Sequence, residues 1–127
     1  MRINDRFRFR VYKKVFEQYL YDAQDGEWPD WPLKEYLYND KFIVEQCTGL
    51  KDKNGRLIYE GDIICDADLA DIYEQRTGIG EIRWNGDNAE FALYMTDGDY
   101  ISLDNMSSSA EIIGNIHKNA ELLEENK

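Results

Sequence analysis

Residues 46–64 read QCTGLKDKNGRLIYEGDII, and the turn signals in this stretch decide the fold. Asn54-Gly55 supplies residues that tolerate positive φ angles, so Leu50–Arg56 is predicted to be a loop between two strands. Gly61-Asp62 falls where a strand must bend sharply, a position that favours a residue without a Cβ. Four aliphatic residues around these turns are core candidates: Leu57, Ile58, Ile63 and Ile64.

The second half of the chain continues this alternation of short strands and turns. Gly78-Ile79-Gly80 is predicted to open a strand, and Asn85–Asn88 is predicted to be a hairpin turn. The predicted strands are Glu81–Trp84, Phe91–Met95, Tyr100–Leu103 and Glu111–Ile116. Asn119 is predicted to cap a short terminal helix, Ala120–Glu125. Turn signals every 8–12 residues or so, without βαβ alternation, predict a mainly β chain that forms a small barrel or roll.

The N-terminal part begins with strict alternation over residues 6–12, which is typical of a half-buried strand. One face would carry Phe7, Phe9 and Val11, and the other would carry Arg6, Arg8 and Arg10. Residues 13–22 fit either a helix or a second strand after a turn at Lys13-Lys14, and their Tyr and Val content favours the strand.

The next segment is predicted to be a loop, a helix and a strand. Asp22–Asp30 is polar and contains a glycine, so it is expected to be exposed. Pro32 suits the first turn of a short helix, Leu33–Tyr38, because its missing N–H would be unpaired there in any case. Phe42–Glu45 is then expected to return as a strand.

Charge is distributed unevenly along the 127 residues. The net charge is −11, but the first 14 residues hold six Arg or Lys against Asp5 alone, a balance of +5, which leaves −16 on the rest. An acidic body repels phosphate backbones, so nucleic acid is a disfavoured partner. Cys47 and Cys65 form no CxxC pair and are interpreted as reduced, partly buried residues of a cytoplasmic protein. No apolar run predicts secretion or membrane insertion.

The central motif resembles the YopX-like proteins of bacteriophages and prophages. The residues that carry the resemblance are Thr48, Gly49, Leu50, Asp52, Asn54, Gly55, Tyr59, Glu60, Gly61 and Asp62. Two further pieces agree in order: Phe7–Arg10, and Ile112–Ile116 with Gly114 and Asn115, followed by Asn119–Leu123. Cys47 stands where the family usually has an aromatic residue, and Ala120 where a helix-opening proline is frequent.

The resemblance implies an SH3-type β-roll with an N-terminal strand and helix elaboration and a short C-terminal helix. The length of 127 residues predicts one domain, 1–127, with the elaboration in 1–41 and the roll core and terminal helix in 42–127. The resemblance also implies a phage or prophage accessory protein in the cytoplasm of a bacterial host. It implies neither an activity nor a cofactor, because the family has no assigned catalytic residues.

Candidates for chemistry in the sequence are few. His117 is the sole histidine and lacks an elbow motif or a neighbouring cysteine, so no catalytic site is predicted. One histidine and two separated cysteines are an incomplete zinc set. Asp62, Asp66, Asp68 and Asp71 could hold Mg²⁺ or Ca²⁺, but their spacing is not that of an EF-hand. A solvated acidic loop is the favoured interpretation, and no metal or cofactor is predicted.

The candidate interaction surface consists of Arg6, Arg8, Arg10, Trp28 and Trp31. The three arginines could grip phosphates, with Tyr12, Tyr19 and Tyr21 stacking on bases, or they could pair with the chain's many carboxylates. Pairing with carboxylates is favoured because of the acidic remainder. Trp28 and Trp31 fit either packing onto the roll or a protein interface.

The leading functional hypothesis is therefore a non-enzymatic protein-interaction module that self-associates and has a host or phage protein as a further partner. One alternative is a nucleic-acid-binding protein that uses Arg6, Arg8 and Arg10. A second alternative is an acidic mimic that occupies the basic surface of a host nucleic-acid-binding protein. A third is a metal-dependent enzyme at Asp62, Asp66 and Asp68.

Overall fold

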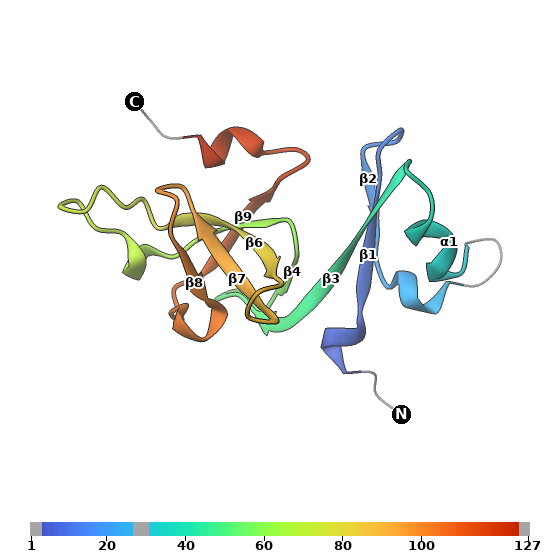
Figure 1. The fold of residues 1–127 in the computed structure, drawn as a ribbon, viewed down its shortest axis with the longest axis horizontal. Coiled ribbons are helices and arrows are strands. Elements are labelled where there is room, and N and C mark those ends of the chain that lie inside the picture. The colour runs from blue at the N-terminus through green and yellow to red at the C-terminus, as the bar shows by residue number, and fades with distance from the viewer. Residues whose placement is uncertain (1–3, 27–30, 125–127) are drawn as a thin grey trace. The chain divides into compact units, whose positions relative to one another are not determined.

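The structure is a computed structural model that describes residues 4–26 and 31–124. The chain divides into two compact units, Met1–Leu50 and Lys51–Lys127, and each has its own sheet and core (Figure 1). This boundary falls near the end of strand β3 (Phe42–Lys51), and the sequence-based division between residues 41 and 42 stays a prediction. The assignment of all 127 residues to one domain stays a prediction.

The first unit is an antiparallel sheet with helical segments packed against it. Its strands are β1 (Phe9–Lys13), β2 (Gln18–Leu20) and β3, in the order β2-β1-β3. The register places Val11 opposite Leu20 on one side and Val44 on the other. The helical segments are η1 (Asp5–Phe7), η2 (Ala23–Asp25) and α1 (Leu33–Leu37).

A small core joins the sheet of the first unit to its helices. Val11, Ala23 and Tyr36 are buried together, so β1, η2 and α1 each contribute one residue. The predicted helix after Pro32 is confirmed as α1. Tyr36 is its only buried residue and anchors it to the sheet. Residues 13–22 contain a turn and a strand rather than a helix. The turn follows Lys13 and has Glu17 at φ 51°, and it leads into β2, which pairs with β1.

The predicted strand over residues 6–12 is wrong at its start. The side chain of Asn4 accepts a hydrogen bond from the backbone N–H of Arg6 at 3.0 Å, and Asp5–Phe7 forms a 3₁₀ turn. Such local bonds from asparagine compete with extension of a strand. Phe7 is consequently exposed, and the strand begins at Phe9.

The second unit holds a five-stranded antiparallel sheet in the order β8-β7-β6-β5-β9. The strands of this sheet are β5 (Asp62–Cys65), β6 (Ile79–Asn85), β7 (Glu90–Met95), β8 (Tyr100–Ser102) and β9 (Glu111–Asn115), and the unit also contains the short strand β4 (Leu57–Tyr59), which is not part of it. Short 3₁₀ segments lie at Ala67–Leu69 (η3), Leu103–Asn105 (η4) and Ala120–Leu123 (η5). The mainly β prediction and the small β-roll are confirmed.

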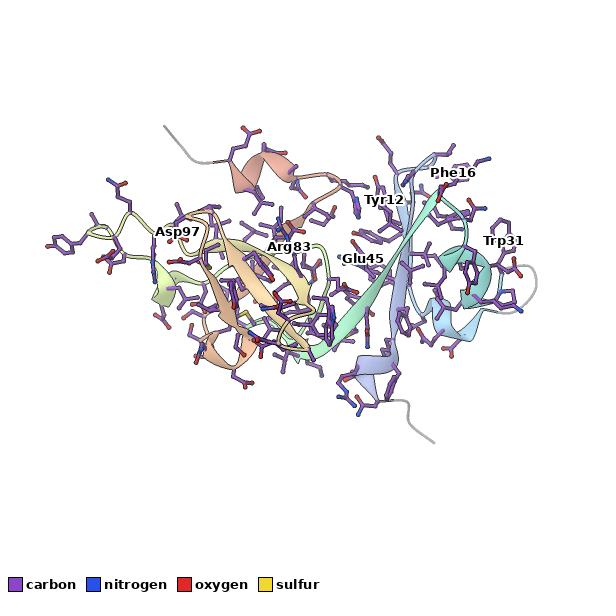
Figure 2. The ribbon with its side chains drawn as sticks, viewed as in Figure 1. Tyr12, Phe16, Trp31, Glu45, Arg83 and Asp97 are labelled. Carbon is purple, nitrogen blue, oxygen red and sulfur yellow. The ribbon has the colours of Figure 1, made fainter. Side chains whose placement is uncertain are left out.

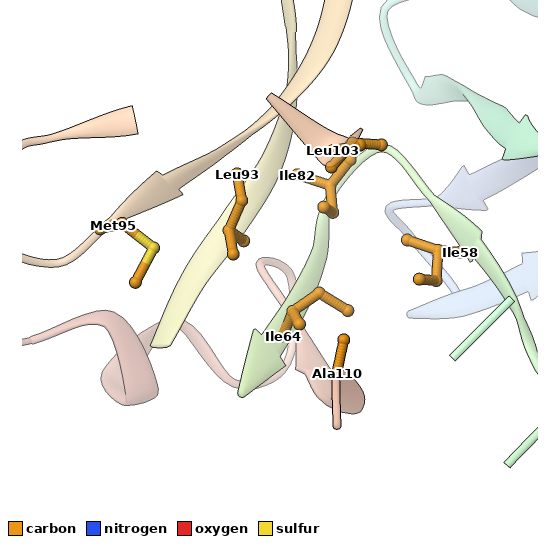
Figure 3. Packing of buried hydrophobic residues seen from close by; sticks show 7 residues of the cluster. All are labelled: Ile58, Ile64, Ile82, Leu93, Met95, Leu103 and Ala110. Carbon is orange, nitrogen blue, oxygen red and sulfur yellow. The ribbon is translucent and has the colours of Figure 1, made fainter. Parts of the chain in front are cut away.

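Buried aliphatic residues from most of these strands meet in one cluster (Figure 3). Ile58 on β4, Ile64 on β5, Ile82 on β6 and Leu93 on β7 are each at most 1% exposed. Ile58 and Ile64 were core candidates of the opening stretch, and so was Ile63, which is also fully buried. Burial of such side chains is the main favourable term in folding.

The terminal helix is present but shorter and tighter than predicted. It is the 3₁₀ segment η5, and Asn119 does not cap it with its side chain. The Asn119 carboxamide instead accepts the backbone N–H of Asn115 at 3.1 Å, and a Cβ on Gly114 would lie 2.6 Å from the same oxygen. The Gly-Asn pair of the family motif therefore lets Asn119 fold back onto β9.

Candidate functional site

The three arginines do not form one exposed basic face. Arg10 is 3% exposed, and its Nε lies 2.8 Å from Glu45 Oε1, to which the Tyr19 hydroxyl also donates at 2.9 Å. The Arg10 guanidinium also stacks over the Tyr19 ring, 4.2 Å from its centroid. This geometry matches the interpretation in which the arginines pair with the chain's own carboxylates.

Arg8 and Arg6 lie in different settings. Arg8 Nη1 donates to Asp22 at 3.3 Å, and its Nε lies 3.1 Å from Asp5 Oδ1 without the alignment of a hydrogen bond. Arg6 lies in η1, exposed, with its guanidinium 5.4 Å from the centroid of the Phe7 ring. Since two of the three charges are compensated within the first unit, little is left to hold a phosphate backbone.

Trp31 borders an apolar groove in the first unit, whereas Trp28 lies outside the described residues. The Trp31 ring stacks on Tyr36 at 5.4 Å and meets Phe42 edge-on at 5.3 Å. The groove has a volume of about 340 Å³ and is lined by four apolar residues, two lysines and an asparagine: Val15, Phe16, Trp31, Phe42, Lys13, Lys41 and Asn39. Phe16 comes from the β1–β2 turn and Trp31 from the segment before α1 (Figure 2).

The charge of this groove differs from that of the chain as a whole. Among the described residues, neither Lys13 nor Lys41 has an ion-pair partner. Phe16 is 69% exposed although it is a large apolar residue. The groove therefore combines an apolar lining with two uncompensated positive charges in a protein of net charge −11.

The central motif is held by one carboxylate. Asp52 Oδ1 accepts the backbone N–H groups of Asn54 and Arg56, both at 2.9 Å, while Oδ2 accepts that of Ile112 at 3.1 Å. Burial would raise the pKa of Asp52, but these three N–H groups and the nearby Arg56 charge outweigh it and hold the pKa below its usual value. The motif is thus explained by the turn it builds.

Gly61-Asp62 serves the same purpose at the next bend. Gly61 has φ 84°, which favours glycine, and Asp62 Oδ2 accepts the backbone N–H of Tyr59 at 2.8 Å. The other aspartates bond elsewhere: Asp66 accepts the backbone N–H and the hydroxyl of Ser107. Over residues 4–26 and 31–124, no group of three or more His, Cys, Asp or Glu side chains is placed to hold a metal.

His117 and the cysteines lie apart from these features. The backbone N–H of His117 donates to Asn115 Oδ1 at 3.0 Å, in the turn that follows β9. Cys47 is buried on β3, Cys65 is half-buried at the end of β5, and the two are not joined by a disulfide.

The sequence predicted a solvated acidic loop around Asp66, Asp68 and Asp71, but not that the segment between β5 and β6 would project from the sheet and expose apolar side chains. In Figure 1 this segment extends from the sheet as a narrow yellow-green excursion. At its end, which we name the tip loop (residues 71–76), Ile72 is 91% exposed and Tyr73 is 98% exposed. The sequence did contain a signal, because Ile72-Tyr73 is an apolar pair within an otherwise polar run, residues 71–77.

The tip loop is ordered by bonds at its base. The backbone groups of Asp71 and Arg76 pair in both directions, at 2.9 and 2.7 Å, and the Asp71 side chain accepts the N–H of Tyr73 at 2.9 Å. Arg76 adds ion pairs to Asp97 at 3.2 Å and Asp99 at 2.9 Å. The two apolar side chains therefore stand on a supported turn.

Comparison with known proteins gives a family and related folds. The YopX protein family model matches residues 14–124, which span both units. Protein EF1440 from Enterococcus faecalis has a similar crystal structure, with a TM-score of 0.54 and 23% identity over 92% of this chain and 97% of that one. YopX from Bacillus subtilis has a TM-score of 0.54 and 18% identity over 94% of this chain and 99% of that one.

These solved structures support the fold alone, because their identity to this chain is low. No curated protein matches the chain. In the part of the chain that the structure describes, none of the helices has the length and apolar character needed to span a membrane.

Proposed function

We propose that this chain, which belongs to the YopX protein family, is a non-enzymatic protein-interaction module that self-associates. The observation that carries the proposal is the tip loop, which presents Ile72 and Tyr73 almost fully to solvent. Adjacent exposed apolar side chains favour burial against another protein surface. Tyrosine is also among the residues enriched in interfaces.

The order of the tip loop strengthens this proposal. A loop that is already held by the Asp71–Arg76 pairing loses little conformational entropy on binding. Arg76 and its two ion pairs also keep the turn close to the β7–β8 connection. The loop therefore presents its apolar residues in a form that is ready to bind.

The family resemblance supports a proposal about the biological setting in which the protein acts. We place the protein among phage or prophage accessory proteins that act in a bacterial cytoplasm, with a host or phage protein as an additional partner. Nucleic-acid binding through Arg6, Arg8 and Arg10 has less support, because Arg10 and Arg8 are engaged by Glu45, Asp22 and Asp5. The acidic-mimic alternative rests on charge alone.

Sedimentation velocity over a range of protein concentrations tests the proposal. The wild-type chain is expected to form reversible oligomers, and the Ile72→Ser/Tyr73→Ser variant is expected to remain a monomer. Tyr38→Ser is the matched control, because Tyr38 is 89% exposed at the end of α1 and lies outside the tip loop. A wild-type chain that stays monomeric up to its solubility limit would contradict self-association.

A further inference from the structure

Two of the surfaces on which this chain exposes large apolar side chains differ in charge. One is the tip loop in the second unit, with Ile72 and Tyr73 exposed. The other is the groove in the first unit, with its apolar lining and its two lysines. We infer that the tip loop of one copy inserts Ile72 and Tyr73 into the groove of a second copy, an inference that rests on the proposed self-association.

Charge complementarity supports a second copy as the occupant. The projecting segment carries Asp68, Asp71 and Glu74, with no basic residue before Arg76. Asp97 and Asp99 compensate the charge of Arg76. The acidic segment would thus meet Lys13 and Lys41, which lack ion-pair partners among the described residues. Charge pairing of this kind sets register and raises the association rate.

Size supports the same occupant. A groove of about 340 Å³ is at the lower end of the range of ligand pockets, roughly 300–1,000 Å³, so it suits one or two side chains. Phe16, Trp31 and Phe42 offer ring faces and edges to a tyrosine, which favours offset or edge-on packing. Lysine stems can lie along such apolar surface while their ammonium groups reach the acidic flanks.

Tip loop and groove are different surfaces, so one contact leaves a second tip and a second groove open. These are filled either by a reciprocal contact in a two-fold pair or by further copies in a ring or an open chain. A contact made by one loop buries less than the roughly 1,200 Å² of a standard interface. The association is therefore weak, with a dissociation constant in the micromolar range or above.

A complementation experiment tests this arrangement. The tip variant is Ile72→Ser/Tyr73→Ser, and the groove variant is Phe16→Ser/Lys41→Glu, which alters exposed positions only. Each variant alone is expected to be a monomer, with association weakened about tenfold or more. Mixed together, they keep one intact tip and one intact groove, so a one-to-one dimer is expected.

Controls keep the outcomes distinct. Tyr38→Ser and Lys34→Glu change an exposed tyrosine and an exposed lysine outside both surfaces, and they are expected to associate as the wild type does. A charge exchange adds a second measurement: Glu74→Lys is expected to weaken association, and mixing it with Lys13→Glu/Lys41→Glu is expected to restore a dimer. Circular dichroism of each variant confirms that it is folded.

Three results would overturn the inference. The first is a groove variant that self-associates like the wild type, and the second is a mixture of the tip and groove variants that stays monomeric. In either case, the proposed function would still hold if wild-type oligomers depend on the tip loop. The tip loop would then contact a surface other than the groove, for example the tip loop of a second copy. The third, a wild-type chain that is monomeric throughout, would remove self-association itself.

Discussion

Two loops of the second unit begin with aspartate, end with arginine and close with the same backbone hydrogen bond. One is fixed against the core of the unit, and the other projects into solvent. In residues 52–56, the N–H of Asp52 donates to the carbonyl of Arg56 at 2.8 Å. In residues 71–76, the N–H of Asp71 donates to the carbonyl of Arg76 at 2.9 Å. In both loops the aspartate Oδ1 accepts two backbone N–H groups within the turn.

The loops differ in what fixes them to the rest of the unit. Asp52 is 6% exposed and reaches the N–H of Ile112 across the chain, while the N–H of Lys53 donates to the Ala110 carbonyl at 2.8 Å. Among the described residues, the side-chain contacts that fix the tip loop to the rest of the unit are the ion pairs of Arg76. Directly after its aspartate it carries Ile72 and Tyr73, where the other loop carries Lys53 and Asn54. The same turn closure therefore occurs both in a loop that is fixed to the core and in a loop that exposes an apolar pair.

Replacing Asp52 is expected to give the largest loss of stability. In Asp52→Asn, the amide Nδ2 would face the N–H of Ile112, so a buried donor loses its acceptor. We expect the free energy of unfolding to fall by about 2–3 kcal/mol, measured by urea denaturation followed by circular dichroism. Asp71→Asn, at the exposed loop, is the matched control and is expected to cost about 0.5 kcal/mol or less.

The effect of Asp52→Asn is expected to depend on pH. Because the N–H groups hold the pKa of Asp52 below its unfolded value of about 3.9, the folded carboxylate contributes stability above that value. The contribution is lost as pH falls through the lowered pKa. The difference between wild type and Asp52→Asn should therefore be full near neutral pH and shrink in strong acid. A difference in the free energy of unfolding that grows on acidification would contradict a lowered pKa for Asp52.

Gly55→Ala is expected to lower the free energy of unfolding by about 1 kcal/mol, because of backbone strain alone. Gly55 has φ 82°, and a Cβ there would meet nothing within 4 Å. Gln75 at φ 56° is the counterpart in the tip loop, so Gln75→Gly should relieve strain and leave stability unchanged or slightly raised. Equal losses for both substitutions would argue against the assigned turn geometries.

Arg76→Gln removes the ion pairs that tie the tip loop to Asp97 and Asp99. These charges are partly exposed, so screening limits the loss of stability to about 0.2–1 kcal/mol. We expect a larger effect on self-association, because an untied loop must be ordered when it binds. Sedimentation velocity and urea denaturation of the same sample separate the two effects. A variant that loses stability but associates normally would mean that loop order is irrelevant to binding.

The smallest effect on stability is expected from the tip itself. Ile72→Ser/Tyr73→Ser changes side chains that are 91% and 98% exposed. The free energy of unfolding should therefore change by about 0.5 kcal/mol or less. Thermal and urea denaturation check this at low protein concentration, where oligomers are absent. A strongly destabilised variant would show that the two residues pack within the chain.

The sequence predicted the features that depend on neighbouring residues. Asn54-Gly55, Gly61 and Pro32 each act through local backbone chemistry, and the turn, bend and helix they predicted are present. The burial of Arg10 was not predictable, because it depends on Glu45, which lies 35 positions away. The strand start at Phe9 was missed because the side-chain bond of Asn4 outweighed the alternating pattern.

The candidate interaction surface was predicted only in part. Trp31 borders the groove, but Phe16, Lys13 and Lys41 join it through pairing of β1 with β2 and β3, which the sequence left undecided. The tip loop was missed because an apolar pair within an acidic segment fits a buried turn as well as an exposed one. Only the closing of the loop at Asp66 and Gly78 and at Asp71 and Arg76 puts the pair in solvent.

Hydrogen–deuterium exchange of the wild-type chain at increasing concentration compares the two loops directly. The account predicts that the backbone amides of residues 72–75 become protected as oligomers form, while those of residues 53–56 exchange at the same rate throughout. Oligomers that form without any added protection of residues 72–75 would contradict the claim that the tip loop is the contact surface.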